Sequence, residues 1–165
     1  MDGGLIKLYP EHSFRDMSPN GGECMLICGL VLVLGVGAAA FNLSLSWSLI
    51  ELGAFFGLAT ILANVAHSTL HHLVLHPERV QSMKTTLRGW RWVCAIAEGA
   101  IIRVFSEWGR VVGLLERGEH DLLGMRFDWF CGVWGEGPRR EEMQNNQMRA
   151  VLTVVMFAFL VCVFA

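Results

Sequence analysis

Charge is almost absent from two long parts of this sequence. Between residues 25 and 66 the one charged side chain is Glu51, and residues 150–165 carry none, while the mean hydropathy of the whole chain is +0.45. Such clustering excludes an ordinary water-soluble domain. As one helix the first stretch would be about 60 Å long, twice the thickness of a bilayer core, so two helices joined by a turn near residues 42–48 fit better. The second stretch, residues 150–165, would be about 24 Å long as a helix, slightly shorter than the bilayer core.

The sequence also lacks features of several functional classes of protein. With a net charge of −2 the chain lacks the basic excess of a nucleic-acid-binding protein, so no nucleic-acid partner is expected. The five cysteines are odd in number and mostly lie in apolar surroundings, which indicates reduced thiols rather than a disulfide framework. We recognise no nucleophile with a base, phosphate-binding loop or pair of catalytic carboxylates. We therefore expect neither catalytic residues nor a metal site.

The basic residues are unevenly distributed. Of the thirteen Lys and Arg residues, all but Lys7, Arg15 and Arg149 fall within residues 73–148. The positive-inside rule places that segment, and with it the N-terminus, on the inner side of the membrane. The predicted fold is an all-α membrane protein. Its parts are a polar N-terminal segment (1–23), a transmembrane hairpin (24–72), an inside segment (73–148) and a C-terminal transmembrane helix (149–165).

Small residues predict close packing between the spanning helices. In the first span Gly35 and Ala39 allow another backbone to approach closely. In the second span Gly53 and Gly57 begin a stripe whose alternating spacings of four and three lie on one helical face. Because the stripe has no polar counterpart in the other spans, we expect other integral membrane subunits, or bound lipid, to cover it. The other members of the stripe are Thr60, Asn64, His67 and His71.

A second periodicity predicts an amphipathic helix over residues 90–117. Apolar residues recur there at spacings of four and three, whereas Arg103, Glu107 and Arg110 fall on the other face and form surface pairs. Tryptophans in and beside this helix suit a membrane interface. We expect the helix to dock on the membrane surface or on a partner. The apolar positions are Val93, Ala97, Ile101, Val104, Trp108, Val111 and Leu115.

His67 and His71 are the candidate cofactor-binding residues. Their spacing of four places both imidazoles on one helical face, and imidazole is an axial ligand of haem iron. A haem held between two helices would need a second histidine from another chain, because the other predicted spans have none. A single imidazole would suit a chlorophyll-like pigment. The alternative is that these histidines form hydrogen bonds at the helix end, with no cofactor.

Two short segments resemble known families. Residues 105–115, FSEWGRVVGLL, resemble the BH1 segment of Bcl-2 family apoptosis regulators, and the apolar C-terminus resembles the tail anchor of that family. This resemblance implies a regulator in which residues 1–148 are soluble without the tail. Residues 62–68, LANVAHS, are similar to part of the proton-channel subunit of ATP synthase, although Thr60 stands where that segment has an arginine.

The expected function is that of a non-catalytic accessory or structural subunit of a large energy-converting membrane complex. The expectation rests on the small size, the small-residue faces and an association with accessory subunits of organelles. The mitochondrial inner membrane, with its respiratory chain, electron transport and ATP synthase, is the expected location, and the plastid thylakoid is the alternative. Two other functions stay open. One is a haem- or chlorophyll-binding anchor subunit of an oxidoreductase or photosystem, and the other is a tail-anchored Bcl-2-like regulator.

Overall fold

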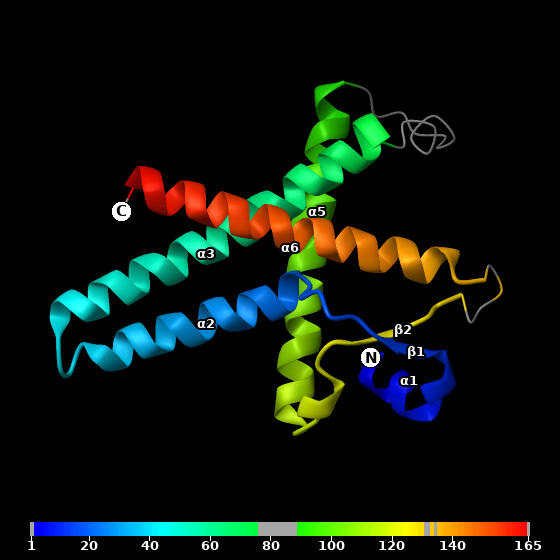
Figure 1. Ribbon diagram of the computed structural model, residues 1–165, viewed down its shortest axis with the longest axis horizontal. Helices are drawn as coiled ribbons and strands as arrows, with labels where there is room; N and C mark the ends of the chain where they lie inside the picture. Colours follow the sequence, from blue (N-terminus) through cyan, green and yellow to red (C-terminus); the bar gives the residue numbers. More distant parts are fainter. Residues whose placement is uncertain (1, 76–88, 131–132, 134, 165) are drawn as a thin grey trace.

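Three long apolar helices form the body of the protein (Figure 1). The computed structural model describes residues 2–75, 89–130, 133 and 135–164. Helices α2 (Gly21–Ala38) and α3 (Leu43–Leu70) form a hairpin, and α6 (Gly137–Phe164) is the C-terminal helix. Each is long and apolar enough to cross a membrane. The predicted all-α membrane fold, with a transmembrane hairpin and a C-terminal transmembrane helix, is therefore confirmed.

Two asparagine caps fix where the hairpin helices begin. The Asn20 side chain accepts a hydrogen bond from the backbone N–H of Glu23 at 2.9 Å, and the Glu23 carboxylate accepts one from the backbone N–H of Asn20 at 3.1 Å. This reciprocal pair is a complete capping box for α2. Asn42 caps α3 through its side-chain oxygen. The turn therefore occupies residues 39–42, slightly earlier than predicted, and the serines that follow belong to the first turns of α3.

Helix α3 is the central helix of the body. It packs against α2, α5 and α6, and the π-helical turn η2 (His71–Leu75) continues it. Ala59 and Ala63 are fully buried in it, and Phe56 meets Phe157 of α6 edge to face with ring centroids 5.4 Å apart. The end of α6 lies on the same side of α5 as the hairpin turn (Figure 1).

Helix α6 extends further toward the N-terminus than the span predicted at residues 149–165. It begins at Gly137, and its 28 residues rise about 42 Å. Polar first turns run directly into the uncharged stretch, without a break in the helix. The apolar stretch, short by itself, is thus the end of a helix that exceeds the thickness of a bilayer core.

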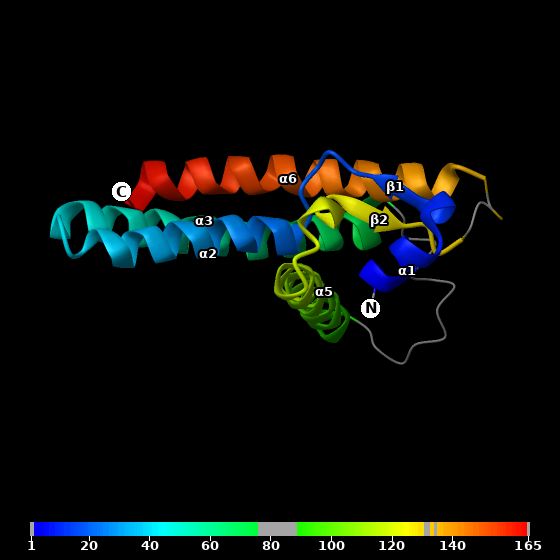
Figure 2. The ribbon, with the colours of Figure 1, turned by 90° about the horizontal axis from the view of Figure 1, so that it is seen from below.

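Helix α5 (Trp90–Glu116) crosses the long helices, as the two views in Figures 1 and 2 agree. The predicted amphipathic helix over residues 90–117 matches these bounds, but its buried face is rotated from the predicted apolar line. Only Val104 and Val111 belong to both sets, because packing against α2 and α3 also draws the Glu107 side of the helix inward. The buried residues are Ile96, Ala100, Val104, Val111 and Leu114.

Several apolar residues of α5 lie outside its buried face, on the neighbouring side of the helix. Ile101 and Phe105 are 37% and 53% exposed, and the Trp108 ring lies beside Gly29, 3.7 Å from where a β-carbon on that glycine would stand. Gly29 lies two turns beyond Gly22, the residue of α2 that meets the backbone of α5, in the direction of the hairpin turn. The exposed apolar face of α5 thus adjoins the apolar part of α2, as expected of a helix at a membrane surface.

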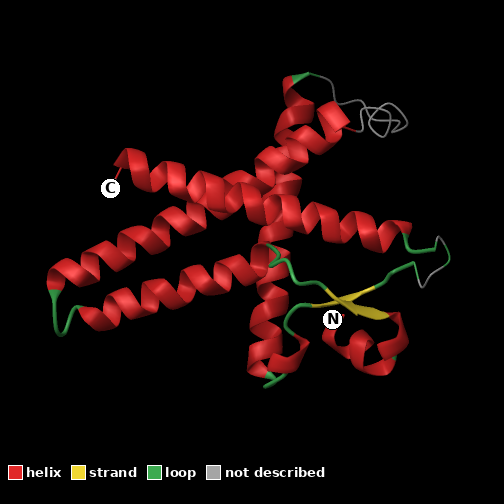
Figure 3. Cartoon of the chain, in the orientation of Figure 1, coloured by secondary structure: helices red, strands yellow, loops and turns green. Residues whose placement is uncertain are grey.

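A small unit beside α5 holds the only strands among the described residues (Figure 3). Strand β1 pairs antiparallel with β2, with Phe14 opposite Arg126. The sequence analysis did not predict this pair, because three-residue strands are too short to show an alternating pattern. A small apolar core of Ile6, Leu114 and Leu122 ties the unit to α5. Its elements are α1 (Asp2–Leu8), η1 (Pro10–His12), β1 (Ser13–Arg15), η3 (His120–Leu122) and β2 (Met125–Phe127).

Candidate functional site

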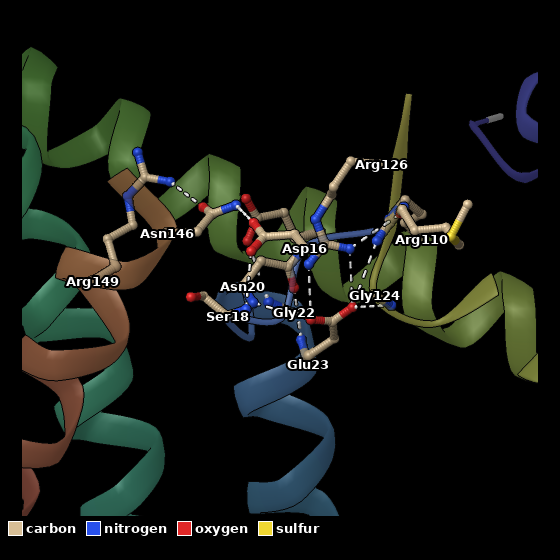
Figure 4. A network of polar contacts seen from close by, with 12 residues as sticks. Asp16, Ser18, Asn20, Gly22, Glu23, Arg110, Gly124, Arg126, Asn146 and Arg149 are labelled. Atoms are coloured by element: carbon tan, nitrogen blue, oxygen red, sulfur yellow. Dashed lines mark hydrogen bonds and ion pairs between the residues drawn. The ribbon is translucent and has the colours of Figure 1, made fainter. Parts of the chain in front are cut away.

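Buried polar side chains gather where α2 begins, at the point where α5, α6 and strand β2 come together (Figure 4). Hydrogen bonds and ion pairs connect residues that lie more than one hundred positions apart in the sequence. Charged groups are buried in proteins at a high cost unless they are paired, so this network is the clearest candidate for a functional or organising site. We call it the polar cluster. Its members are Asp16, Asn20, Glu23, His67, Glu107, Arg110, Arg126, Asn146 and Arg149.

Glu23 is the most connected residue of the polar cluster. The guanidinium of Arg126 donates to both carboxylate oxygens, from Nη1 to Oε1 at 3.0 Å and from Nη2 to Oε2 at 2.9 Å. The backbone N–H of Gly124 donates to Oε1 at 2.9 Å, and Arg110 Nη2 lies 3.8 Å from the same oxygen. This bidentate, charge-assisted geometry is strong and directional. One carboxylate therefore caps α2 and also fastens β2 and α5 to its first turn.

The first turn of α2 touches the backbone of α5. A β-carbon at Gly22 would collide with the carbonyl group of Glu107 and would stand 2.6 Å from the backbone nitrogen of Trp108. The Gly22 N–H donates to Glu107 Oε2 at 3.3 Å, which places a negative charge at the positive end of the helix. Glu107 and Arg110 are thus tied to α2 and β2, and the prediction that they face outward in surface pairs is wrong.

A second chain of hydrogen bonds joins the N-terminal segment to α6 and α3. Asn146 Nδ2 donates to Asp16 Oδ2 at 2.8 Å, and Arg149 Nη1 donates to Asn146 Oδ1 at 3.0 Å. Arg149 Nε then donates to His67 Nδ1 at 3.3 Å. All four side chains are buried, so these bonds fix the position of α6 at the end of its polar section.

The stripe of small and polar residues on α3 is covered within the chain itself. All six of its members are buried. A β-carbon would stand 2.9 Å from Leu32 Cδ2 at Gly53 and 2.9 Å from Cys28 Sγ at Gly57, so both glycines receive side chains of α2. The expectation that neighbouring subunits cover this stripe is therefore wrong, because its counterparts come from α2, α5 and α6.

The first span contributes one of its two predicted packing residues. Gly35 is buried, and a β-carbon there would stand 2.9 Å from Ile50 Cγ1 of α3. Ala39 is exposed instead, because α2 ends at Ala38 and the chain turns toward α3 at that point.

His67 and His71 lie together and are both buried, as their spacing of four on one helical face implies. Their rings stack side by side with centroids 5.8 Å apart and planes 20° apart, so a haem bound to either ring would need its second ligand from another chain. Nδ1 of His67 accepts from Arg149, and His71 Nε2 lies 3.8 Å from Glu141. The adjacent cavity of about 210 Å³ is smaller than ordinary ligand pockets of about 300–1,000 Å³. Within the described ranges, no three His, Cys, Asp or Glu residues are placed to hold a metal ion.

Sequence reasoning missed the main members of the polar cluster. The Asn20-x-x-Glu23 pattern directly before an apolar run is a capping-box signal, so it identifies Glu23 as the start of a helix. No local signal pairs Glu23 with Arg126, because their contact depends on how β2 folds back across the chain. No family model, curated protein or solved structure matches this chain.

Proposed function

We propose that this protein is a non-catalytic integral membrane subunit that helps to hold together a larger energy-converting complex. The proposal places it beside other integral membrane subunits, in the mitochondrial inner membrane or, alternatively, in the plastid thylakoid. In this role the polar cluster organises the inner ends of the spanning helices rather than performing a reaction, since its carboxylates accept hydrogen bonds from guanidinium, side-chain amide and backbone N–H groups.

The main support for the proposal is that little of α6 is buried by the rest of the chain. Only 11% of its most apolar 18-residue stretch is buried within the chain, compared with 28% for α2. Its packing within the chain is mainly with α3, through a line of residues that includes Thr153 and Leu160. The remaining faces present large apolar side chains that need lipid or another helix. These exposed residues are Val151, Val154, Val155, Phe159, Val163 and Phe164.

A tail-anchored regulator fits the arrangement less well. Such a protein carries its membrane-spanning segment at the C-terminus, whereas α2 and α3 are also long and apolar enough to span. The segment that resembles BH1 lies in α5, which packs against both of these helices. We therefore keep the accessory subunit as the proposed function.

Native-gel sizing after extraction in a mild detergent, with mass spectrometry of the co-migrating proteins, tests this proposal. We expect the protein to migrate with a large respiratory or photosynthetic complex and to remain there when the detergent concentration is doubled. A protein that runs as a small free particle in the mildest detergent that extracts it would contradict the proposal.

A further inference from the structure

We propose that α5 lies embedded in one leaflet of the bilayer, the leaflet opposite the hairpin turn, where lipid acyl chains cover its exposed apolar face. The 27 residues of α5 add about 40 Å of helix to that leaflet and none to the other. The protein is therefore a wedge that favours a curved membrane, with the leaflet that holds α5 on the convex side. This inference goes beyond the subunit role and does not depend on it.

The level at which α5 crosses the hairpin is the edge of the hydrocarbon core (Figures 1 and 2). A β-carbon on Gly21 would stand 3.1 Å from Val104 Cγ2 of α5 and 3.4 Å from Asn64 Nδ2 of α3, so three helices meet at this level. From Leu43, directly after the turn, to Asn64 helix α3 rises about 32 Å, which matches a core of about 30 Å. A hairpin turn at one surface of the core thus places α5 at the other surface.

The apolar face that α5 leaves uncovered points along the hairpin, into the core. Trp108 shows the direction, because its ring lies beside Gly29, which is about 10 Å closer to the turn than Gly22. Residues at spacings of three and four from Trp108 stand on the same side of the helix. Ile101 and Phe105 are among them, and both are exposed. The face comprises Trp90, Cys94, Ala97, Ile101, Phe105, Trp108 and Val112.

The opposite side of α5 is polar and faces away from the core. Arg110 Nη1 donates to the backbone carbonyl of Met125 in strand β2 at 2.9 Å. Arg103 lines a cavity together with Glu141 and Asn145, which belong to the polar section of α6. An apolar side toward the core and a polar side away from it are the arrangement of a helix that lies in the plane of the membrane.

Continuity with the spanning surface of α2 identifies acyl chains as the cover of this face. Gly29, Val33 and Val36 follow one another on one side of α2 at spacings of four and three, and the two valines are 69% and 67% exposed. The face of α5 meets this line where Trp108 lies beside Gly29. A water-soluble partner would have to enter the core to reach both surfaces, whereas acyl chains already fill that space.

Spin-label accessibility in proteoliposomes tests where α5 lies. Phe105→Cys and Ser106→Cys, each with Cys94, Cys131 and Cys162 replaced by serine, place a nitroxide on neighbouring exposed residues about 100° apart around the helix. Oxygen concentrates among acyl chains, and a hydrophilic nickel complex stays in water. We expect the ratio of relaxation by oxygen to relaxation by nickel to be at least about fivefold higher for Phe105→Cys than for Ser106→Cys.

Two results of the accessibility measurement would overturn the proposal. Equally strong relaxation of both labels by nickel would place the apolar face in water. Slow relaxation of the Phe105→Cys label by both reagents would show that protein, such as a second copy of this chain, covers the face instead of lipid.

Membrane tubes pulled from giant vesicles test the wedge. When α5 lies in the outer leaflet of the vesicle, the protein should be at least about twofold denser in the tube than in the vesicle, and in the reverse orientation it should be depleted. Ile101→Ser with Phe105→Ser changes two exposed side chains, so it should keep the fold and lose at least about half of the enrichment. Equal density in tube and vesicle, or equal enrichment of this variant and the wild type, would contradict the wedge.

Discussion

Replacing Glu23 with alanine should destabilise the protein more than any other single loss of charge. The change leaves Arg126 buried without its bidentate partner and also removes half of the capping box of α2. Breaking a buried ion pair from one side costs about 3–5 kcal/mol. For a chain of this size each kcal/mol lowers the melting temperature by roughly 2–4 °C, so we expect a fall of roughly 6–20 °C in detergent.

Two further variants test whether the lower melting temperature of Glu23→Ala comes from the broken ion pair or from the loss of a charge in general. Glu98→Ala removes an exposed carboxylate of α5 and should shift the melting temperature by less than about 2 °C. The double variant Glu23→Met with Arg126→Met removes both charges together, and it should recover at least half of the loss because the Arg126 charge no longer stays buried without its bidentate partner. A double variant no more stable than Glu23→Ala would contradict the assignment of the loss to an unpaired Arg126.

Gly22→Ala should loosen α5 from the hairpin. The added methyl group would collide with backbone atoms of Glu107 and Trp108, which cannot move as a flexible side chain can. Overpacking typically costs about 1–3 kcal/mol of stability. Because the neighbours here are rigid backbone atoms, we expect a loss of about 3 kcal/mol. The measurement is the melting temperature in detergent, together with the rate of proteolysis within α5, which should rise.

Gly37→Ala is the matched control on the same helix. Nothing lies within 4 Å of a β-carbon at that position, so the change should be neutral or should stabilise α2 by about 0.5–1 kcal/mol through its backbone. If Gly22→Ala and Gly37→Ala behave alike, the close approach of α2 and α5 is not present in solution.

The sequence predicts the helices of this protein well because their signal is local. A run without charge identifies a spanning helix by itself, and the spacing of Gly53, Gly57 and Thr60 identifies the packed face of α3. The partners of that face could not be predicted in the same way. Arg149 reaches His67 across 82 positions, and the polar section of α6 reads locally as a solvated lead into the span.

The rotation of α5 has a similar cause. Hydrophobic periodicity finds the apolar side of a helix, but two packing environments compete for the apolar side chains of α5. The contact with α2 buries Val104 and the small core with Ile6 buries Leu114, whereas Ile101 and Phe105 are left exposed. A sequence pattern cannot divide one broad apolar face between protein and membrane, because both favour the same residue types.

Cysteine accessibility across a sealed membrane tests the central claim most directly, namely that the hairpin spans and α5 stays on one side. The background carries Cys94→Ser, Cys131→Ser and Cys162→Ser and keeps the buried Cys24 and Cys28. Phe41→Cys reports on the hairpin turn and Glu116→Cys on the end of α5, both exposed positions. We expect an impermeant maleimide to label the two reporters from opposite faces of vesicles of known orientation. Labelling of both from the same face would contradict a spanning hairpin.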